Sequence, residues 1–201
     1  MKQIIKTYEV YTYDELNEEA KERVKKWYLE SQDVATFTFI VTEDLRSLFP
    51  RSELDVQYSL GDQQGDGFNI YGSVDLKDVL NYRKDYFTEK EKRTLKFYFC
   101  NYDCNIILDE NKRYLYCICD DADVAEPIID ELEKWSVRDI NKKLIYKLEN
   151  AVKHIFTELC NQYEKEGYSY FYEIDDETLS EICDDNEYYF MKNGSFFHEA
   201  D

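Results

Sequence analysis

The stretch INKKLIYKLENAVKHIFTELCNQYEKEG, residues 140–167, decides the fold because it predicts one long helix. Its apolar residues recur every three or four positions, the spacing that places side chains on one face of a helix. They are Ile140, Leu144, Leu148, Val152, Ile155, Leu159 and Tyr163. Gly167 is of the residue type that commonly follows a helix end. We therefore expect a helix from about 138 to 165, with this face among the most buried parts of the protein.

Shorter elements surround this helix in an irregular order. Strand patterns cover residues 4–11, 54–60, 68–74, 105–108, 113–119 and 168–174, and a final hairpin joins 187–191 to 195–197. Helix patterns cover residues 16–32, 33–48, 88–98 and 177–183, and Pro127 suits the first turn of a short acidic helix. Regular βαβ alternation is missing, so we expect an α+β fold. In it, a mainly antiparallel sheet packs against the long helix, with additional short helices, in a single domain spanning 1–201.

Two Thr-x-x-Glu patterns mark expected helix starts. Thr12 with Glu15, and Thr88 with Glu91, have the spacing of a capping box, in which each side chain bonds the backbone N–H of the other residue. Asn17 is a second candidate cap for the first of these helices.

The negative charge of the chain is concentrated in two short segments. The formal net charge of the 201 residues is -19. Residues 120–133 hold seven acids and no Lys or Arg, and residues 171–201 hold ten acids against Lys192 alone. A field of that sign repels nucleic acid and attracts basic protein surfaces. We therefore expect a basic protein partner and no direct binding of nucleic acid.

Composition and the first residues indicate where the protein works. With 43% hydrophobic and 16% aromatic residues, the chain can bury a core, unlike a disordered acidic chain. The start, MKQIIKTYEVYTY, has no apolar run of signal-peptide length, and no stretch approaches a membrane span. We expect a cytoplasmic protein without membrane contact, whose six cysteines are reduced thiols.

Three segments resemble a family of uncharacterised proteins encoded in phages and prophages. They are YSLGDQQGDGF at 58–68 with its QGDG core, the tail from Gly167 to Gly194, and the opening VYTYDEL at 10–16 with Glu18, Glu19, Ala20 and Lys21. Residues 76–135 fall outside the resemblance. The resemblance implies a phage-borne accessory protein acting in the host cell, and it implies no catalytic residues. Small acidic phage proteins of this kind often look like inhibitors of host defence nucleases, including anti-CRISPR and antirestriction proteins.

The partner-binding site is expected on the two acidic segments. Its residues are Asp175, Asp176, Glu177, Glu181, Asp184, Asp185 and Glu187 of the tail, with Asp120, Asp121 and Asp123. In the tail these acids are interleaved with Tyr170, Tyr172, Tyr188 and Tyr189. Acids mixed with aromatic residues match the Arg-rich, base-stacking grooves that hold nucleic acid. A merely solvated face is the alternative interpretation of this tail.

Four other patterns are weighed as sites of chemistry. Asp62 and Asp66 around QGDG could face a metal, but Asp-Gly also favours a tight hairpin turn. A zinc site would use Cys100, Cys104, Cys117 and Cys119, none of which has the common C-x2-C spacing; a core role is the alternative. The cluster Asp120–Asp123 with Glu126 could bind a cation, but acids before Pro127 also suit the N-terminal end of a helix. His154 and His198 are the available bases for a cysteine nucleophile, and a structural or solvent-facing role is the alternative.

These features favour a non-catalytic inhibitor that binds a basic, nucleic-acid-handling host protein, such as a defence nuclease. It would compete with nucleic acid or block assembly, with no catalytic residue, metal or cofactor. The alternatives are an antitoxin or regulatory partner of a basic toxin, and a small metal-dependent enzyme. The surplus of aromatic residues favours a homodimer, provided that the acidic segments stay apart.

Overall fold

The computed structural model describes residues 6–61, 65–110 and 122–198. The chain divides into two compact units. Unit 2, Ala35–Gly167, is one continuous segment, and unit 1 combines Met1–Val34 with Tyr168–Asp201. The prediction of a single domain stays a prediction, since two compact units can unfold as one cooperative domain.

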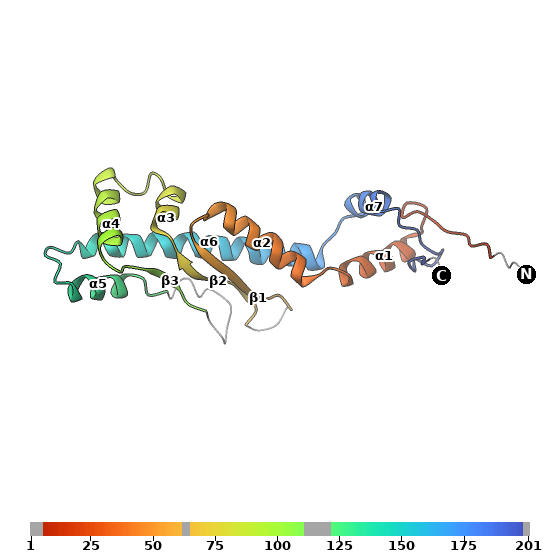
Figure 1. The fold of residues 1–201 in the computed structure, drawn as a ribbon. Coiled ribbons are helices and arrows are strands. Elements are labelled where there is room, and N and C mark those ends of the chain that lie inside the picture. The colour runs from red at the N-terminus through yellow and green to blue at the C-terminus, as the bar shows by residue number, and fades with distance from the viewer. Residues whose placement is uncertain (1–5, 62–64, 111–121, 199–201) are drawn as a thin grey trace, which may run out of the picture. The chain divides into compact units, whose positions relative to one another are not determined.

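The described residues form seven helices and a three-stranded antiparallel sheet, which confirms the predicted α+β class (Figure 1). In chain order the elements are α1 (Glu18–Glu30), α2 (Val34–Leu48), β1 (Glu53–Ser59), β2 (Gly67–Val74), α3 (Leu76–Tyr82), α4 (Glu89–Asn101), β3 (Ile106–Leu108), α5 (Ala125–Lys134), α6 (Lys142–Tyr172) and α7 (Asp176–Asp185).

The sheet of unit 2 has the strand order β1-β2-β3. Val56 of β1 lies opposite Ile70 of β2, and Val74 opposite Ile106 of β3. All four side chains are buried, so they form the core face of the sheet. The predicted strands at 54–60, 68–74 and 105–108 are therefore confirmed, whereas the one predicted at 113–119 lies outside the described residues.

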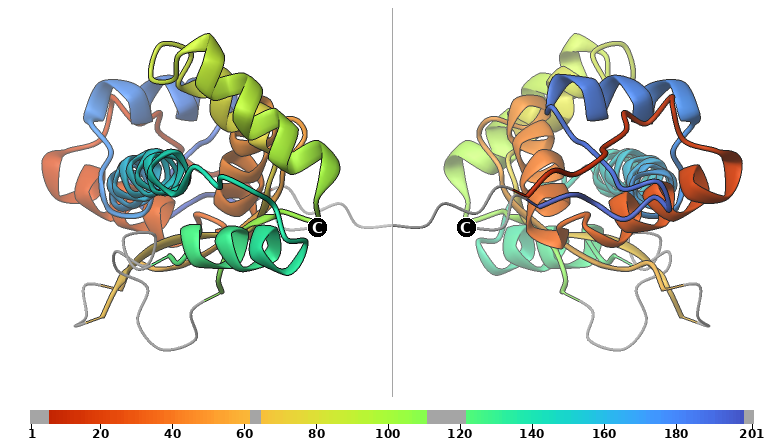
Figure 2. Two further views of the ribbon diagram at one scale, coloured as in Figure 1. Left: turned by 90° about the vertical axis from the view of Figure 1, so that its left-hand side faces the viewer. Right: turned by 90° about the vertical axis from the view of Figure 1, so that its right-hand side faces the viewer.

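Helix α6 is the central scaffold of unit 2. The predicted residues Leu144, Leu148, Val152, Ile155 and Leu159 are each at most 3% exposed, which confirms the buried face. The ring of Tyr163 packs at a tilt against that of Phe68 of β2, with 5.6 Å between the ring centroids, so the helix packs against the sheet. Figures 1 and 2 show α3 and α4 on one side of α6, and α5 with the sheet on the other.

The predicted end of the long helix was wrong. α6 continues through Gly167 to Tyr172, so the strand predicted at 168–174 does not form. A Cβ at Gly167 would lie 2.3 Å from Cδ1 of Leu60 and 3.1 Å from the ring of Phe37. This glycine therefore allows close packing inside the helix and does not stop it.

Side chains cap α3 and α4 in unit 2. Thr88 and Glu91 form the predicted capping box at the start of α4, and the backbone and side-chain hydrogen bonds of Thr88, with Lys147, lower the pKa of Glu91 to about 2. Asp75 caps α3, a helix that the sequence patterns did not predict. Pro127 lies in the first turn of α5, as predicted.

Unit 1 is built on α1 and α7. Its core consists of Tyr13, Leu16, Ala20, Val24, Leu179, Cys183 and Phe190. Isolated bridges join Tyr11 to Phe190 and Phe190 to Phe196, and they replace the predicted terminal hairpin strands. Within the described part of the first predicted strand, only Tyr11 forms a bridge. Asn17, the second candidate, caps α1.

Candidate partner-binding site

Two of the predicted acids stabilise the fold of unit 1. Asp175 is the N-cap of α7 and accepts hydrogen bonds from the backbone N–H and the hydroxyl of Thr178, both at 2.8 Å. Asp176 accepts a hydrogen bond from the Tyr13 hydroxyl at 2.8 Å and pairs with Lys25 at 2.6 Å. The hydrogen bonds from Thr178 lower the pKa of the Asp175 carboxyl. The interactions with Lys25, and then with Tyr13, lower the pKa of the Asp176 carboxyl. Both acids therefore already have partners inside the protein.

The remaining tail acids form a surface that we name the α7 acidic face. It consists of Glu177, Glu181, Asp184, Asp185 and Glu187, all of which are exposed. Within the described part of the chain, none of the five side chains forms an ion pair or a hydrogen bond. Positions 177, 181, 184 and 185 share one side of the helix by their spacing, while the buried Leu179 and Cys183 face the core. The structure thus places four unpaired carboxylates on one side of α7, with Glu187 two residues beyond the end of the helix.

The acids at the end of α7 oppose the local electrostatics of the helix. Asp184 and Asp185 lie in the last turn, which contains no basic residue. The C-terminal end of a helix carries partial negative charge, so cations are favourable there and carboxylates are not. Local helix stability therefore does not explain these two acids.

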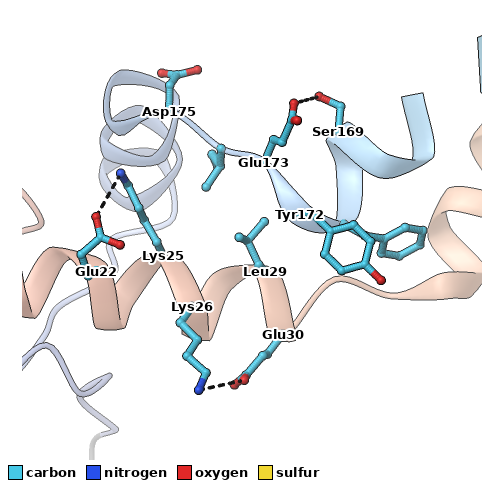
Figure 3. A pocket seen from close by; sticks show the side chains of 11 residues that line it. Glu22, Lys25, Lys26, Leu29, Glu30, Ser169, Tyr172, Glu173 and Asp175 are labelled. Carbon is cyan, nitrogen blue, oxygen red and sulfur yellow. Dashed lines mark hydrogen bonds and ion pairs between the residues drawn. The ribbon is translucent and has the colours of Figure 1, made fainter. Parts of the chain in front are cut away.

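A groove of about 950 Å³ lies in unit 1 beside the start of α7. Its lining includes Leu29 of α1, Tyr172 at the end of α6 and Asp175. Around it, Lys25 pairs with Glu22 at 3.6 Å, Lys26 with Glu30 at 3.7 Å, and Ser169 donates to Glu173 at 3.2 Å (Figure 3). The charges of the groove are therefore largely paired, in contrast to the α7 acidic face. The sequence patterns did not predict this groove, because its walls come from opposite ends of the chain.

The tyrosines interleaved with the acids also divide into residues that pack in the core and residues that are exposed. Tyr188 is half-buried and packs edge-on against Trp27 at 5.7 Å, so it belongs to the core of unit 1. Tyr172 and Tyr189 are 54% and 44% exposed. Of the four interleaved tyrosines, these two are the exposed ones.

The second predicted acidic segment is only partly described. Asp120 and Asp121 lie outside the described residues. Asp123 is exposed and accepts a hydrogen bond from the Glu126 backbone N–H at 3.3 Å, in the first turn of α5. This bond fits the role of a helix N-terminal acid. Asp123 belongs to unit 2, whereas α7 belongs to unit 1.

The candidate metal and nucleophile residues are placed as follows. Three of them, Asp62, Cys117 and Cys119, lie outside the described residues. Asp66 accepts a hydrogen bond from the Ser59 hydroxyl at 2.6 Å, beside the Ser59–Gly67 pair that closes the β1–β2 hairpin. No group of three or more His, Cys, Asp or Glu able to hold a metal occurs in the ranges that the structure describes.

Most of the described thiols are buried, and the histidine of α6 is exposed. Cys104 and Cys183 are buried free thiols, and burial raises the pKa of each to about 11, so both stay protonated at neutral pH. His154 is exposed and lies 2.7 Å from Arg83 and 2.9 Å from Glu158, in a surface cluster.

Comparison with known proteins adds no relative. No family model, no curated protein and no solved structure matches the chain. Among the described helices, none has the length and apolar character needed to cross a membrane.

Proposed function

We propose that this chain is a phage-encoded, non-catalytic inhibitor that binds a basic, nucleic-acid-handling host protein in the host cytoplasm. The α7 acidic face is the docking surface, and the target is of the defence-nuclease class. A carboxylate row competes with phosphates for the same Arg and Lys side chains, so occupancy of the target's groove excludes nucleic acid.

One observation carries this proposal: four exposed carboxylates share one side of α7 and Glu187 lies just beyond its end. None of the five has a partner in the described chain, and two of them oppose the helix dipole. Residues that break a local stability rule without a compensating contact are commonly retained for function. Long-range attraction to a basic partner is such a function, because it raises the association rate.

The test is affinity capture on the purified chain from a host lysate at low and at high ionic strength, followed by a cleavage assay on the captured nuclease. The fourfold variant E181K/D184K/D185K/E187K reverses the face while placing cations at the end of α7, where the helix dipole favours them. Its matched control, E53K/D85K/E110K/D130K, makes the same change in net charge at exposed positions of unit 2.

We expect the parent and the control to retain a basic nuclease at low ionic strength and to inhibit it. The fourfold variant should associate more slowly and with a flatter dependence on salt, while its circular dichroism spectrum stays unchanged. Equal binding by the fourfold variant and the parent would contradict the proposal, as would failure to recover any basic protein at low ionic strength. Rescue of cells from one adjacent toxin, without nuclease inhibition, would point to an antitoxin.

A further inference from the structure

Unit 2 carries a positive surface that the net charge of the chain conceals. Residues 77–96 contain seven Lys and Arg against four Asp and Glu, a local net charge of +3 in a chain of -19. Some of these cations are paired: Arg83 with Glu158 at 2.6 Å and Lys92 with Glu89 at 2.9 Å. The positive surface lies on the cations that remain.

Three of the remaining cations lie along the outer side of α4 and form, with Phe97, what we name the α4 basic face. Lys90, Arg93 and Lys96 are exposed, and within the described residues none of them forms an ion pair. Lys90, Arg93 and Phe97 follow the i, i+3, i+7 spacing of one helix side, opposite the buried Leu95 and Tyr98.

An exposed aromatic residue and a groove extend this face. Phe97 is 52% exposed and contacts Tyr102 at a ring distance of 6.0 Å. Lys96 also lines a groove of about 410 Å³, whose border includes Lys77 of α3 and Arg51. Cations around exposed apolar area are suited to an acidic protein surface that also carries aromatic groups.

We propose that the α4 basic face binds the α7 acidic face of a second copy of this chain. The charges are complementary: three exposed cations without an ion pair in the described residues face five exposed carboxylates without one. The lengths match as well, because Lys90–Phe97 and Glu177–Asp184 each span eight residues, a rise of about 10.5 Å along a helix. Tyr189, 44% exposed near the end of α7, supplies a ring for Arg93 or Phe97.

Other occupants and arrangements fit less well. The three cations would neutralise only a few phosphates, too few for stable binding of nucleic acid. A dimer joined through two like faces would bring two acidic faces together. Pairing of unlike faces avoids this repulsion, and a single contact of this kind leaves one face of each kind open at the ends.

The contact is small and therefore concentration-dependent. Two short helix faces bury less than the roughly 800 Å² per partner of a standard stable interface. Self-association therefore covers the α7 acidic face only at high protein concentration. This inference does not need the proposed target, since it is measured on the purified chain alone.

The experiment is sedimentation equilibrium over a range of concentrations at low and high ionic strength. The parent should gain mass with concentration at low ionic strength only. The variants K90E/R93E/K96E and E181K/D184K/D185K/E187K should each stay monomeric. Their equimolar mixture should associate again, because an acidic α4 then meets a basic α7.

Controls separate this contact from general charge effects. The variant R138E/K143E/K165E makes the same change in net charge at exposed positions and should associate as the parent does. The neutral variant K90Q/R93Q/K96Q, used if a reversed variant fails to fold, should weaken association roughly tenfold, about 1.4 kcal/mol shared by three exposed pairs.

A parent that stays monomeric at every concentration would overturn the proposal. So would a mixture of the two reversed variants that fails to associate. Binding of a single-stranded oligonucleotide through the α4 basic face by a monomeric parent would replace the second copy with nucleic acid.

Discussion

The start of α5 depends on a carboxylate from another helix. Glu149 of α6 accepts hydrogen bonds from the backbone N–H groups of Val124 and Ala125 at 3.0 and 2.8 Å. No side chain at the N-cap position of α5 supplies this acceptor. Val124 and Ala125 are at most 1% exposed, so water cannot replace the carboxylate. We predict that Glu149→Ala destabilises unit 2 severely.

The magnitude follows from the two donors. A buried N–H without an acceptor costs about 1–3 kcal/mol, so two of them cost about 2–6 kcal/mol in the free energy of unfolding. Glu149→Gln keeps an acceptor of the same shape but replaces charged hydrogen bonds by neutral ones. Its expected cost is roughly 1–2 kcal/mol, the difference between those two kinds of bond. Urea unfolding followed by circular dichroism measures both values.

The dependence on pH provides a second measurement. Burial alone would raise the pKa of Glu149, but hydrogen bonds from Ala125 and Val124, with Lys153, outweigh it and lower the pKa below its ordinary value of 4.5. The folded state therefore binds this proton less readily than the unfolded chain. The stabilisation by the carboxylate is fully present above pH 4.5 and is lost as the pH falls through the folded-state pKa. The stability difference between the parent and Glu149→Gln should shrink over that range.

A matched control is Lys165→Ala, at an exposed position of the same helix, which should change stability by no more than about 0.5 kcal/mol. If Glu149→Ala behaved like this control, α5 would not depend on the carboxylate and the reasoning would be refuted.

Three further predictions concern packing and helix electrostatics. Leu148→Ala, at a position with 0% exposure, should cost about 2–5 kcal/mol by cavity formation, and a cost below about 1 kcal/mol in urea unfolding would contradict the buried face of α6. Gly167→Ala should destabilise unit 2, because an overpacking cost of about 1–3 kcal/mol exceeds the gain in helix propensity of about 1 kcal/mol; a raised melting temperature would show that Leu60 yields freely. D184N/D185N should stabilise unit 1 at low ionic strength by about 0.3–1 kcal/mol per residue, and the gain should fade in high salt; a loss of stability would show that these acids support the helix.

Local patterns predicted the elements whose stability is local. The apolar spacing of α6 and the capping box at Thr88 are readable because the interacting residues lie within one or two turns. The end of α6 was not readable. Tyr168–Tyr172 is rich in aromatic residues, which favours a strand, yet the two rings at its ends meet at 6.0 Å across one helical turn.

The site was predicted only in part, for a related reason. Counting charges located the acidic tail, but it could not show that Asp176 has partners inside the fold whereas Glu177 has none among the described residues. This difference depends on the hydroxyl of Tyr13, 163 residues away in the sequence. In the same way, the net charge concealed the cations of α4, because a sum over the chain does not show which charges already have partners.

Unit 1 is built from both ends of the chain, with unit 2 between them in the sequence. This arrangement determines the order in which the two units can fold during synthesis. Residues up to Gly167 suffice for unit 2, and a side chain at Gly167 would touch Phe37, so folding of unit 2 brings its two ends together. The nascent chain therefore holds the first half of unit 1 near the point from which the second half will emerge, and the entropic cost of closing that long loop has already been met. Leu179, Cys183 and Phe190 complete the core of unit 1 only afterwards. The α7 acidic face is thus among the last parts of the protein to form, and a chain released by a ribosome before residue 176 would lack it.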